Sequence, residues 1–249
     1  MKQILLIGAG RSASNLIEYL QLKSTETPFE LIIADLNPSL VESRIGSHSN
    51  TKFVTLDIAD DFQRNALVRA SDIVISMLPA FLHISLARGC LKYHKHLVTA
   101  SYVSEQMKAL DEEASLKGLV FMNEIGLDPG IDHMSAMKII DEIKERGGKM
   151  LLFESFTGGL VAPESDDNLW NYKFTWNPRN VVLAGQGGAA KFIQEGKYKY
   201  IPYNKLFRRT EVLNIPGQGK FEGYANRDSL KYREIYGLED IETLYRGTI

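Results

Sequence analysis

Ile4-Leu5-Leu6-Ile7-Gly8-Ala9-Gly10-Arg11-Ser12-Ala13 decides the fold of the first half of the chain. Its apolar start predicts a buried parallel strand, and the pattern Gly-x-Gly-x-x-Ala follows at once. Leu16, Ile17 and Leu20 then recur at helical spacing. A strand, a glycine turn and a helix in this order form the context of the dinucleotide-binding fingerprint.

The glycine turn predicts a site for a pyrophosphate. Gly8 permits a tight turn, Gly10 lets the backbone approach the phosphates, and Ala13 lets the helix pack closely on the sheet. The start of the helix adds unpaired N–H groups and the positive end of its dipole. A lone glycine pattern of this kind is more often an ordinary turn. Here the apolar run 31–34 ends in Asp35, roughly 20 residues further on, where a carboxylate for the adenosine ribose is expected.

Composition limits the classes of partner. The chain has 249 residues and a formal net charge of −2, which favours neither nucleic acid nor an anionic membrane. No apolar run is as long as a membrane span. Cys90 is the single cysteine and shares a helical face with Leu86 and Ala87, so we expect a buried thiol and no internal disulfide. We therefore expect a cytoplasmic protein with a small-molecule substrate and no nucleic-acid or membrane partner, and we leave a homodimer open.

The order of the elements predicts an α/β fold. Six strands alternating with helices indicate a doubly wound Rossmann-type parallel sheet, with ligands at the carboxyl ends of the strands. After Glu124 the pattern changes to a turn-rich link and then to mixed α+β signals. We assign residues 1–124 to a dinucleotide-binding Rossmann domain and 125–249 to an α+β substrate domain. Because the chain stops in what looks like a strand, Leu244 to Ile249, we expect this second domain to be truncated.

Few residues outside the glycine turn carry a clear chemical signal. The five histidines show no spacing typical of metal ligands, so we expect no metal. Asp132 is best interpreted as a helix N-cap, whereas Asp128 lies at the predicted domain junction, where substrates commonly bind. Four cations are candidates for pairing with anionic substrate groups, although each alone is typical of a solvated surface charge: Lys173, Arg179, Arg227 and Arg246.

Several longer motifs resemble a known family. They are Ala-Ser-Tyr-Val-Ser at 100–104, Asn-Glu-Ile-Gly-Leu-Asp-Pro-Gly-Ile-Asp-His at 123–133, Gly-Gly-Leu-Val-Ala-Pro-Glu-Ser at 158–165, Tyr-Lys-Phe-Thr-Trp at 172–176, Asn-Arg-Asp-Ser at 226–229 and Arg-Gly-Thr at 246–248. Together they resemble saccharopine dehydrogenase of the glutamate-forming type over nearly the whole chain, most weakly from about Gln186 to Gly219. The resemblance implies oxidation of the secondary amine of saccharopine to an imine. Hydrolysis of the imine gives L-glutamate and 2-aminoadipate 6-semialdehyde, in lysine metabolism, or the reaction runs in reverse.

The resemblance also implies the site residues. Asp128 is the candidate catalytic residue, because it would hold a substrate ammonium or assist proton removal from the amine. The implied substrate contacts are Ser101, Tyr102, Asp128, Arg227 and Thr248. The implied cofactor contacts are Gly8, Gly10, Arg11, Ser12, Asp35, Asp57, Ile58, Leu78, Pro79, Thr99, Ala100, Leu127, Pro129, Gly130 and Ile131.

Asp35 leads us to predict NAD as the cofactor, with NADP less favoured. Its carboxylate would repel a 2′-phosphate, and Leu36-Asn37-Pro38 supplies no arginine to receive one.

The sequence also departs from the family pattern. Thr157 and Val161 stand where the family usually has cysteine and proline, which affects the expected specificity. The family continues beyond Arg-Gly-Thr with a further arginine and a helical portion, so we expect this chain to bind NAD but to turn saccharopine over poorly. Two alternatives stay open: a carboxyspermidine-type amine dehydrogenase, which the loop at 158–164 disfavours, and a non-catalytic NAD-binding module.

Overall fold

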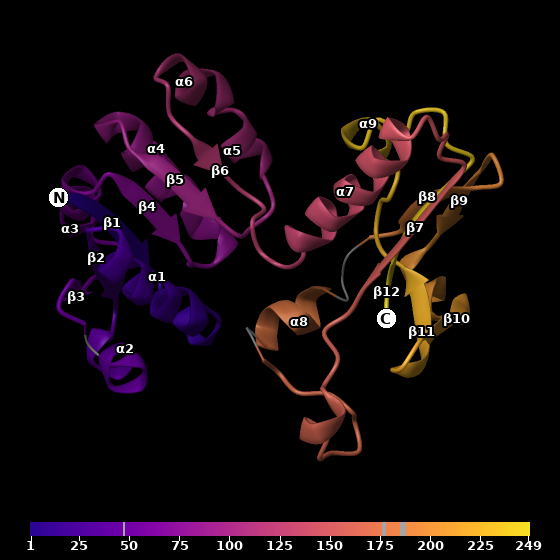
Figure 1. Cartoon of the computed structure of the whole chain (residues 1–249), viewed down its shortest axis with the longest axis horizontal. Helices are drawn as coiled ribbons and strands as arrows, with labels where there is room; N and C mark the ends of the chain where they lie inside the picture. Colours follow the sequence, from indigo (N-terminus) through magenta and orange to yellow (C-terminus); the bar gives the residue numbers. More distant parts are fainter. Residues whose placement is uncertain (47, 176–177, 185–187) are drawn as a thin grey trace. The chain divides into compact units, whose positions relative to one another are not determined.

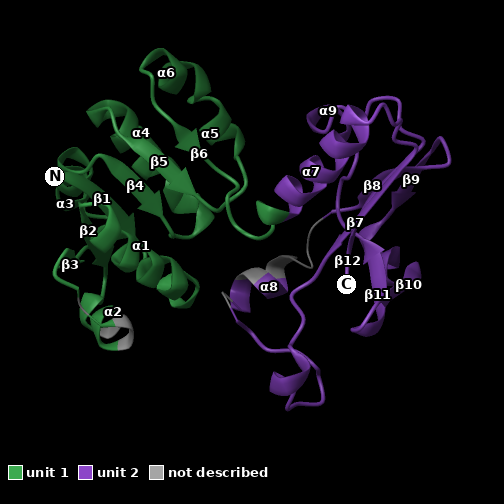
Figure 2. Cartoon of the chain, viewed as in Figure 1, with its two compact units in different colours: residues 1–131 green, residues 132–249 purple. Residues whose placement is uncertain are grey.

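The computed structural model of this protein describes residues 1–46, 48–175, 178–184 and 188–249. Their backbone divides into two compact units, residues 1–131 and 132–249 (Figure 2). Each unit has its own sheet and its own buried core. The domain boundary that we place after residue 124 stays a prediction. Among the described helices, none is both long and apolar enough to cross a bilayer.

Unit 1 is built on a parallel sheet of six strands in the order β3-β2-β1-β4-β5-β6 (Figure 1). The order reverses between β1 and β4, so the switch point at which such sheets bind ligands lies beside the glycine turn. The predicted Rossmann-type fold is confirmed. The strands are β1 (Lys2–Ile7), β2 (Phe29–Asp35), β3 (Thr51–Thr55), β4 (Ile73–Ser76), β5 (His96–Thr99) and β6 (Phe121–Met122).

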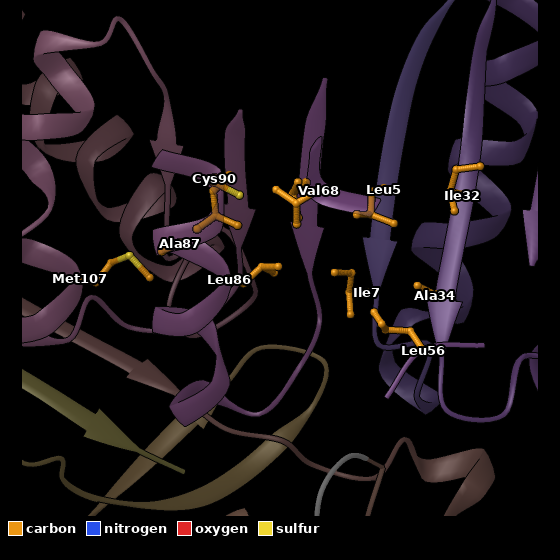
Figure 3. Packing of buried hydrophobic residues seen from close by; sticks show 12 residues of the cluster. Leu5, Ile7, Ile32, Ala34, Leu56, Val68, Leu86, Ala87, Cys90 and Met107 are labelled. Carbon is orange, nitrogen blue, oxygen red and sulfur yellow. The ribbon is translucent and has the colours of Figure 1, made fainter. Parts of the chain in front are cut away.

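Helices cover both faces of this sheet, which explains why the central strands β1 and β2 carry consecutive buried apolar residues. In β1, Leu5 and Ile7 join a cluster with residues of α3, α4 and α5, whereas Leu6 joins a cluster with residues of α1 and α2. The first cluster contains Cys90, as expected (Figure 3). Burial raises the pKa of its thiol to about 12. The helices are α1 (Ser14–Glu26), α2 (Pro38–Ile45), α3 (Asp61–Ala70), α4 (His83–Tyr93), α5 (Glu105–Lys108) and α6 (Asp111–Leu116).

Unit 2 contains a second, mostly antiparallel sheet, in the order β10-β11-β12-β8-β9. Strand β7 pairs with β12 in parallel. The α+β character predicted for this half of the chain is confirmed. Its elements are α7 (Ile131–Glu145, whose first residue belongs to unit 1), β7 (Leu152–Thr157), α8 (Pro178–Ala184), β8 (Ala190–Gln194), β9 (Lys197–Ile201), β10 (Thr210–Ile215), β11 (Gly219–Ala225), α9 (Tyr232–Ile235) and β12 (Thr243–Thr248).

Strand β12 lies at the centre of this second sheet. On one side it pairs with β7 over its whole length, and on the other it pairs with β11 and β8. Leu244 packs in a cluster with residues of α7, whereas its neighbour Tyr245 packs in a different cluster with residues of β8 and β11. The strand expected at the end of the sequence is therefore present. Its partners come from three separate parts of the chain, so local spacing does not reveal the strand order.

The turn after β1 brings Gly8 against the end of β4. Gly8 has a φ of +92°, in the region that favours glycine, and its N–H donates to the carbonyl oxygen of Ala34 at 2.9 Å. A Cβ on Gly8 would lie 3.0 Å from the carbonyl carbon of Met77 and 3.2 Å from the nitrogen of Leu78. The ends of β1, β2 and β4 therefore meet at a point that has no room for a side chain.

We expect Gly8→Ala to destabilise the fold by about 2–3 kcal/mol, because it combines a strained φ with a clash against backbone atoms. Gly118→Ala is the matched control: Gly118 also has a positive φ, of +65°, but a Cβ there would meet nothing within 4 Å. Gly118→Ala should lower the free energy of unfolding only by the cost of a left-handed backbone at alanine, about 1–2 kcal/mol. Urea unfolding of both variants gives the comparison. Equal losses would show that the contact with Met77 is unimportant.

Candidate functional site

The glycine turn leaves open space where a pyrophosphate is expected. Gly10 has extended backbone angles, and a Cβ added to it would meet nothing within 4 Å. Arg11 and Ser12 are exposed in the 3₁₀ turn Arg11–Ala13 that leads into α1, while Ala13 is completely buried. The backbone at Gly10 is thus accessible to an anionic ligand, next to a helix start that favours negative charge.

A cavity of about 160 Å³ adjoins the turn at the carboxyl ends of β1, β2 and β3. Asp35 is the last residue of β2 and Asp57 lies two residues beyond β3, and the apolar side chains of Ile58 and Leu78 line the same cavity. An apolar wall with a few polar groups is typical of a site for a nucleotide. The structure therefore brings together five of the predicted cofactor contacts, which are Gly8, Asp35, Asp57, Ile58 and Leu78.

Asp35 is already engaged by the backbone on both sides. Its Oδ2 accepts a hydrogen bond from the N–H of Ala9 at 2.7 Å, and its Oδ1 accepts one from the N–H of Asn37 at 3.0 Å. The carboxylate therefore ties the glycine turn to the loop after β2. Two N–H donors also offset part of its negative charge. This anchoring role was not expected from the sequence.

The loop after β5 carries two of the predicted substrate contacts. Tyr102 donates its phenolic O–H to Oδ1 of Asp128 at 2.7 Å, so the structure joins two of the predicted residues directly. Glu124 holds the same loop: its N–H donates to the carbonyl oxygen of Ser101 at 3.1 Å, and its Oε1 accepts from the N–H of Val103 at 2.9 Å. Glu124 has a left-handed φ of +59°. Glu124 is thus a residue that supports this loop.

The link before α7 folds back on itself. The N–H of Gly126 donates to the carbonyl oxygen of Pro129 at 2.8 Å, and the N–H of Ile131 donates to that of Gly126 at 3.0 Å. A Cβ on Gly130, whose φ is +151°, would overlap Gly126. Of the predicted cofactor contacts here, Leu127 and Ile131 are exposed, whereas Pro129 and Gly130 are buried. The link therefore needs glycine for its close backbone contact.

Three more of the predicted cofactor contacts lie at the ends of β4 and β5. Pro79 is exposed just beyond β4, and Ala100 is half-buried just beyond β5. Thr99 is 2% exposed, and its Oγ1 lies 3.0 Å from Nε2 of His83, so this hydroxyl is engaged within the fold. His83 is itself buried, which lowers its pKa through loss of solvation.

Arg227 and Thr248 lie in unit 2, whereas the other predicted substrate contacts lie in unit 1. Arg227 is exposed and has a φ of +40°, a conformation uncommon for a residue other than glycine. Its carbonyl oxygen accepts from the N–H of Lys191 at 2.7 Å. Thr248 is half-buried in β12 opposite Tyr224. Trp176, which belongs to one of the motifs quoted above, falls outside the described residues.

Two expectations for unit 2 are wrong. Arg246 is not available for a substrate carboxylate, because its guanidinium pairs with Asp132 and lies 4.3 Å from the centre of the Tyr232 ring. Asp132 lies within the first turn of α7 and pairs with this arginine instead of acting as an N-cap. Both side chains are less than 10% exposed. The partners are 114 residues apart, so spacing gives no signal of the pair.

Known proteins similar to this chain cover it from end to end. The family model for the saccharopine dehydrogenase NADP binding domain matches residues 4–122, and that for the saccharopine dehydrogenase C-terminal domain matches 126–249. The NADP(+), L-glutamate-forming saccharopine dehydrogenase of Schizosaccharomyces pombe is 38% identical over 100% of this chain and 54% of its own length. The enzyme of the same name from Saccharomyces cerevisiae is 34% identical, again over 54% of its length. This chain thus spans about half the length of these curated relatives.

A solved structure gives the same picture. The apo saccharopine dehydrogenase (L-Glu forming) from Saccharomyces cerevisiae superposes with a TM-score of 0.88 and 34% identity, over 100% of this chain and 55% of that one.

The prediction of NAD as the preferred cofactor is wrong. The matching family model is that of an NADP binding domain, and the fungal relatives are named for NADP(+). The prediction treated the Asp35 carboxylate as free to bind ribose hydroxyls and to repel a 2′-phosphate. In the structure both of its oxygens accept backbone N–H groups, so its presence does not by itself select against NADP.

We expect Asp132→Ala to lower the free energy of unfolding by about 3–5 kcal/mol, because it leaves the Arg246 guanidinium buried without its partner. Asp167→Ala is the matched control. It removes a 2.9 Å ion pair with Lys173. The Asp167 side chain is 73% exposed, so its loss should cost less than about 1 kcal/mol. Chemical denaturation followed by circular dichroism measures both. A small effect of Asp132→Ala would mean that Arg246 reaches water or another acceptor.

Proposed function

The chain belongs to the saccharopine dehydrogenase family, and on that premise we propose that it is an oxidoreductase that uses NADP(H) and acts on the secondary amine of saccharopine. The products are L-glutamate and 2-aminoadipate 6-semialdehyde, or the reaction runs in the opposite direction, as part of lysine metabolism. One observation carries the proposal: the glycine turn and its cavity lie at the carboxyl edge of the sheet that also presents Ser101 and Tyr102.

The backbone at Gly10 and the cavity between Asp35 and Asp57 would hold the dinucleotide. When bound, the cofactor accepts or returns a hydride at the carbon next to the substrate nitrogen. The protein contributes by aligning that carbon, and alignment alone is worth several kcal/mol of the barrier. The exposed Arg11 and Ser12 flank the pyrophosphate position in this assignment.

Asp128 is the group that we assign to the substrate nitrogen. Its Oδ1 accepts the hydrogen bond from Tyr102, which fixes the carboxylate, and the described residues place no donor on Oδ2. A carboxylate held in this way binds an ammonium or accepts a proton from a secondary amine. Tyr102 is 43% exposed, so the pair is accessible to a ligand.

Arg227 is the cation that we assign to a substrate carboxylate. Saccharopine carries three carboxylates, and a guanidinium binds a carboxylate through two parallel hydrogen bonds. The left-handed backbone of this exposed residue, at φ +40°, is a strained conformation of the kind that persists at functional sites. Thr248 is half-buried at the carboxyl end of β12, and it is the second contact that we assign in unit 2.

Gly10→Val should abolish binding of NADPH without lowering the melting temperature by more than a few degrees. The added side chain would enter the space assigned to the pyrophosphate, yet it meets no protein atom at its Cβ. Fluorescence titration with NADPH and with NADH, alongside thermal melts, measures this. We expect NADPH to bind the unmodified chain more tightly than NADH. A variant that melts normally and still binds NADPH would refute the assigned site.

Arg227→Ala should weaken saccharopine binding by about 1.5–3 kcal/mol and leave NADPH binding unchanged, because a charge-assisted pair is lost. Arg208→Ala is the control, since Arg208 is an exposed arginine of the same unit that we assign no role. Calorimetric titration of saccharopine into the NADPH-saturated chain measures the change. If the two variants weaken saccharopine binding equally, Arg227 is an ordinary surface charge. A chain that binds NADPH but not saccharopine would be a nucleotide-binding module only.

A further inference from the structure

A buried histidine lies next to the loop that carries Ser101. His83 is the first residue of α4 and is 4% exposed. Its Nδ1 lies 2.8 Å from Oγ of Ser76, and its Nε2 lies 2.8 Å from Oγ of Ser101 and 3.0 Å from Oγ1 of Thr99. All three partners are hydroxyl groups, so each ring nitrogen has a hydrogen-bond partner.

These partners come from two adjacent strands at the edge where the ligands are expected. Ser76 ends β4 and lies opposite Thr99, which ends β5. Beyond β4 the chain continues to Leu78 and Pro79, to which we assign the cofactor. Beyond β5 it continues to Ser101, to which we assign the substrate. The imidazole of His83 therefore lies between the end of β4 and the loop after β5.

The surroundings of His83 favour the neutral form of its ring. Burial lowers the pKa of His83, because the charged imidazolium loses solvation there. Three hydroxyls satisfy a neutral ring without a counter-charge, since each donates or accepts as the ring tautomer requires. A neutral ring of fixed orientation holds a hydroxyl in one direction.

A buried histidine with satisfied nitrogens is often only a structural residue, but the surroundings of Ser101 indicate more. Glu124 already fixes the backbone of the loop, through its bonds to the carbonyl oxygen of Ser101 and to the N–H of Val103. Ser101 is only half-buried, so packing does not determine where its hydroxyl points. The contact with His83 is left to set that direction.

We propose that His83 is a positioning residue that orients the Ser101 hydroxyl toward the polar groups of the amino-acid substrate. This inference rests on the proposed function, because it takes Ser101 to be a substrate contact. His83 touches neither substrate nor cofactor in this assignment. It acts through its hydrogen bond to Ser101. Removing the His83 ring should therefore weaken saccharopine binding no more than removing the Ser101 hydroxyl does.

The test is a double-mutant cycle between His83 and Ser101, read by binding. Saccharopine is titrated calorimetrically into the NADPH-saturated chain, a combination that cannot react. Ser101→Ala and His83→Leu should each weaken saccharopine binding about five- to tenfold, and the double variant should be no weaker than Ser101→Ala alone. Binding of NADPH should change by less than about twofold throughout.

His83→Gln is the conservative variant, because its amide keeps both a donor and an acceptor, and it should recover part of the lost affinity. It also keeps the cycle measurable if His83→Leu does not fold. Additive losses in the double variant, or a loss of NADPH binding equal to that of saccharopine, would show that His83 acts only on the fold and would overturn the inference. If the unmodified chain binds NADPH but not saccharopine, the proposed function and this inference fail together. Non-additive losses support both.

Discussion

The close approach of Gly8 to the end of β4 is the constraint on which the rest of unit 1 depends. Because no side chain fits between this turn and Met77, the carboxyl ends of β1, β2 and β4 converge on one point. The chain must then leave the sheet through Gly10 and a short 3₁₀ turn before α1 begins. The same convergence that excludes a side chain at Gly8 produces the open backbone at Gly10 and the cavity beside Asp35. Packing and ligand access are therefore two consequences of one local geometry.

Asp35 shows why a motif residue does not determine specificity alone. Its position at the end of β2 is set by the sheet, and its spacing from the glycine turn is the same whether its carboxylate faces a ribose or the backbone. In this protein the carboxylate accepts N–H groups from Ala9 and Asn37 and so holds the turn in place. The sequence predicts the location of this residue well, because strand length fixes it. Its hydrogen-bond partners depend on sub-ångström placement of two loops, and no pattern of residue types conveys that.

The fold of unit 1 is predictable because its signals are local. Each buried strand is a short apolar run, each following helix has its own periodic face, and parallel strands place their carboxyl ends at one edge. In unit 2 the individual elements have local signals, but the order of the strands does not. Its central strand, β12, takes its neighbours from β7, β8 and β11, and its Arg246 finds Asp132 across 114 residues. Both the strand order and the Asp132–Arg246 pair depend on contacts between distant parts of the chain. For this reason the sequence indicated Arg246 as a candidate ligand for substrate anions, whereas the structure buries it in an ion pair.

Two buried polar clusters are fixed by different means, the Asp132–Arg246 pair in unit 2 and the network around His83 in unit 1. Asp132 and Arg246 are both charged and nearly excluded from solvent, so each needs the other and neither can move without exposing a bare charge. His83 and its three hydroxyl partners are neutral, so their contacts can exchange donors and acceptors at little cost. The charged pair joins the first turn of α7 to the central strand β12. The neutral network around His83 can hold the Ser101 hydroxyl in one direction while its donors and acceptors exchange roles, which a charged pair such as Asp132 and Arg246 cannot do.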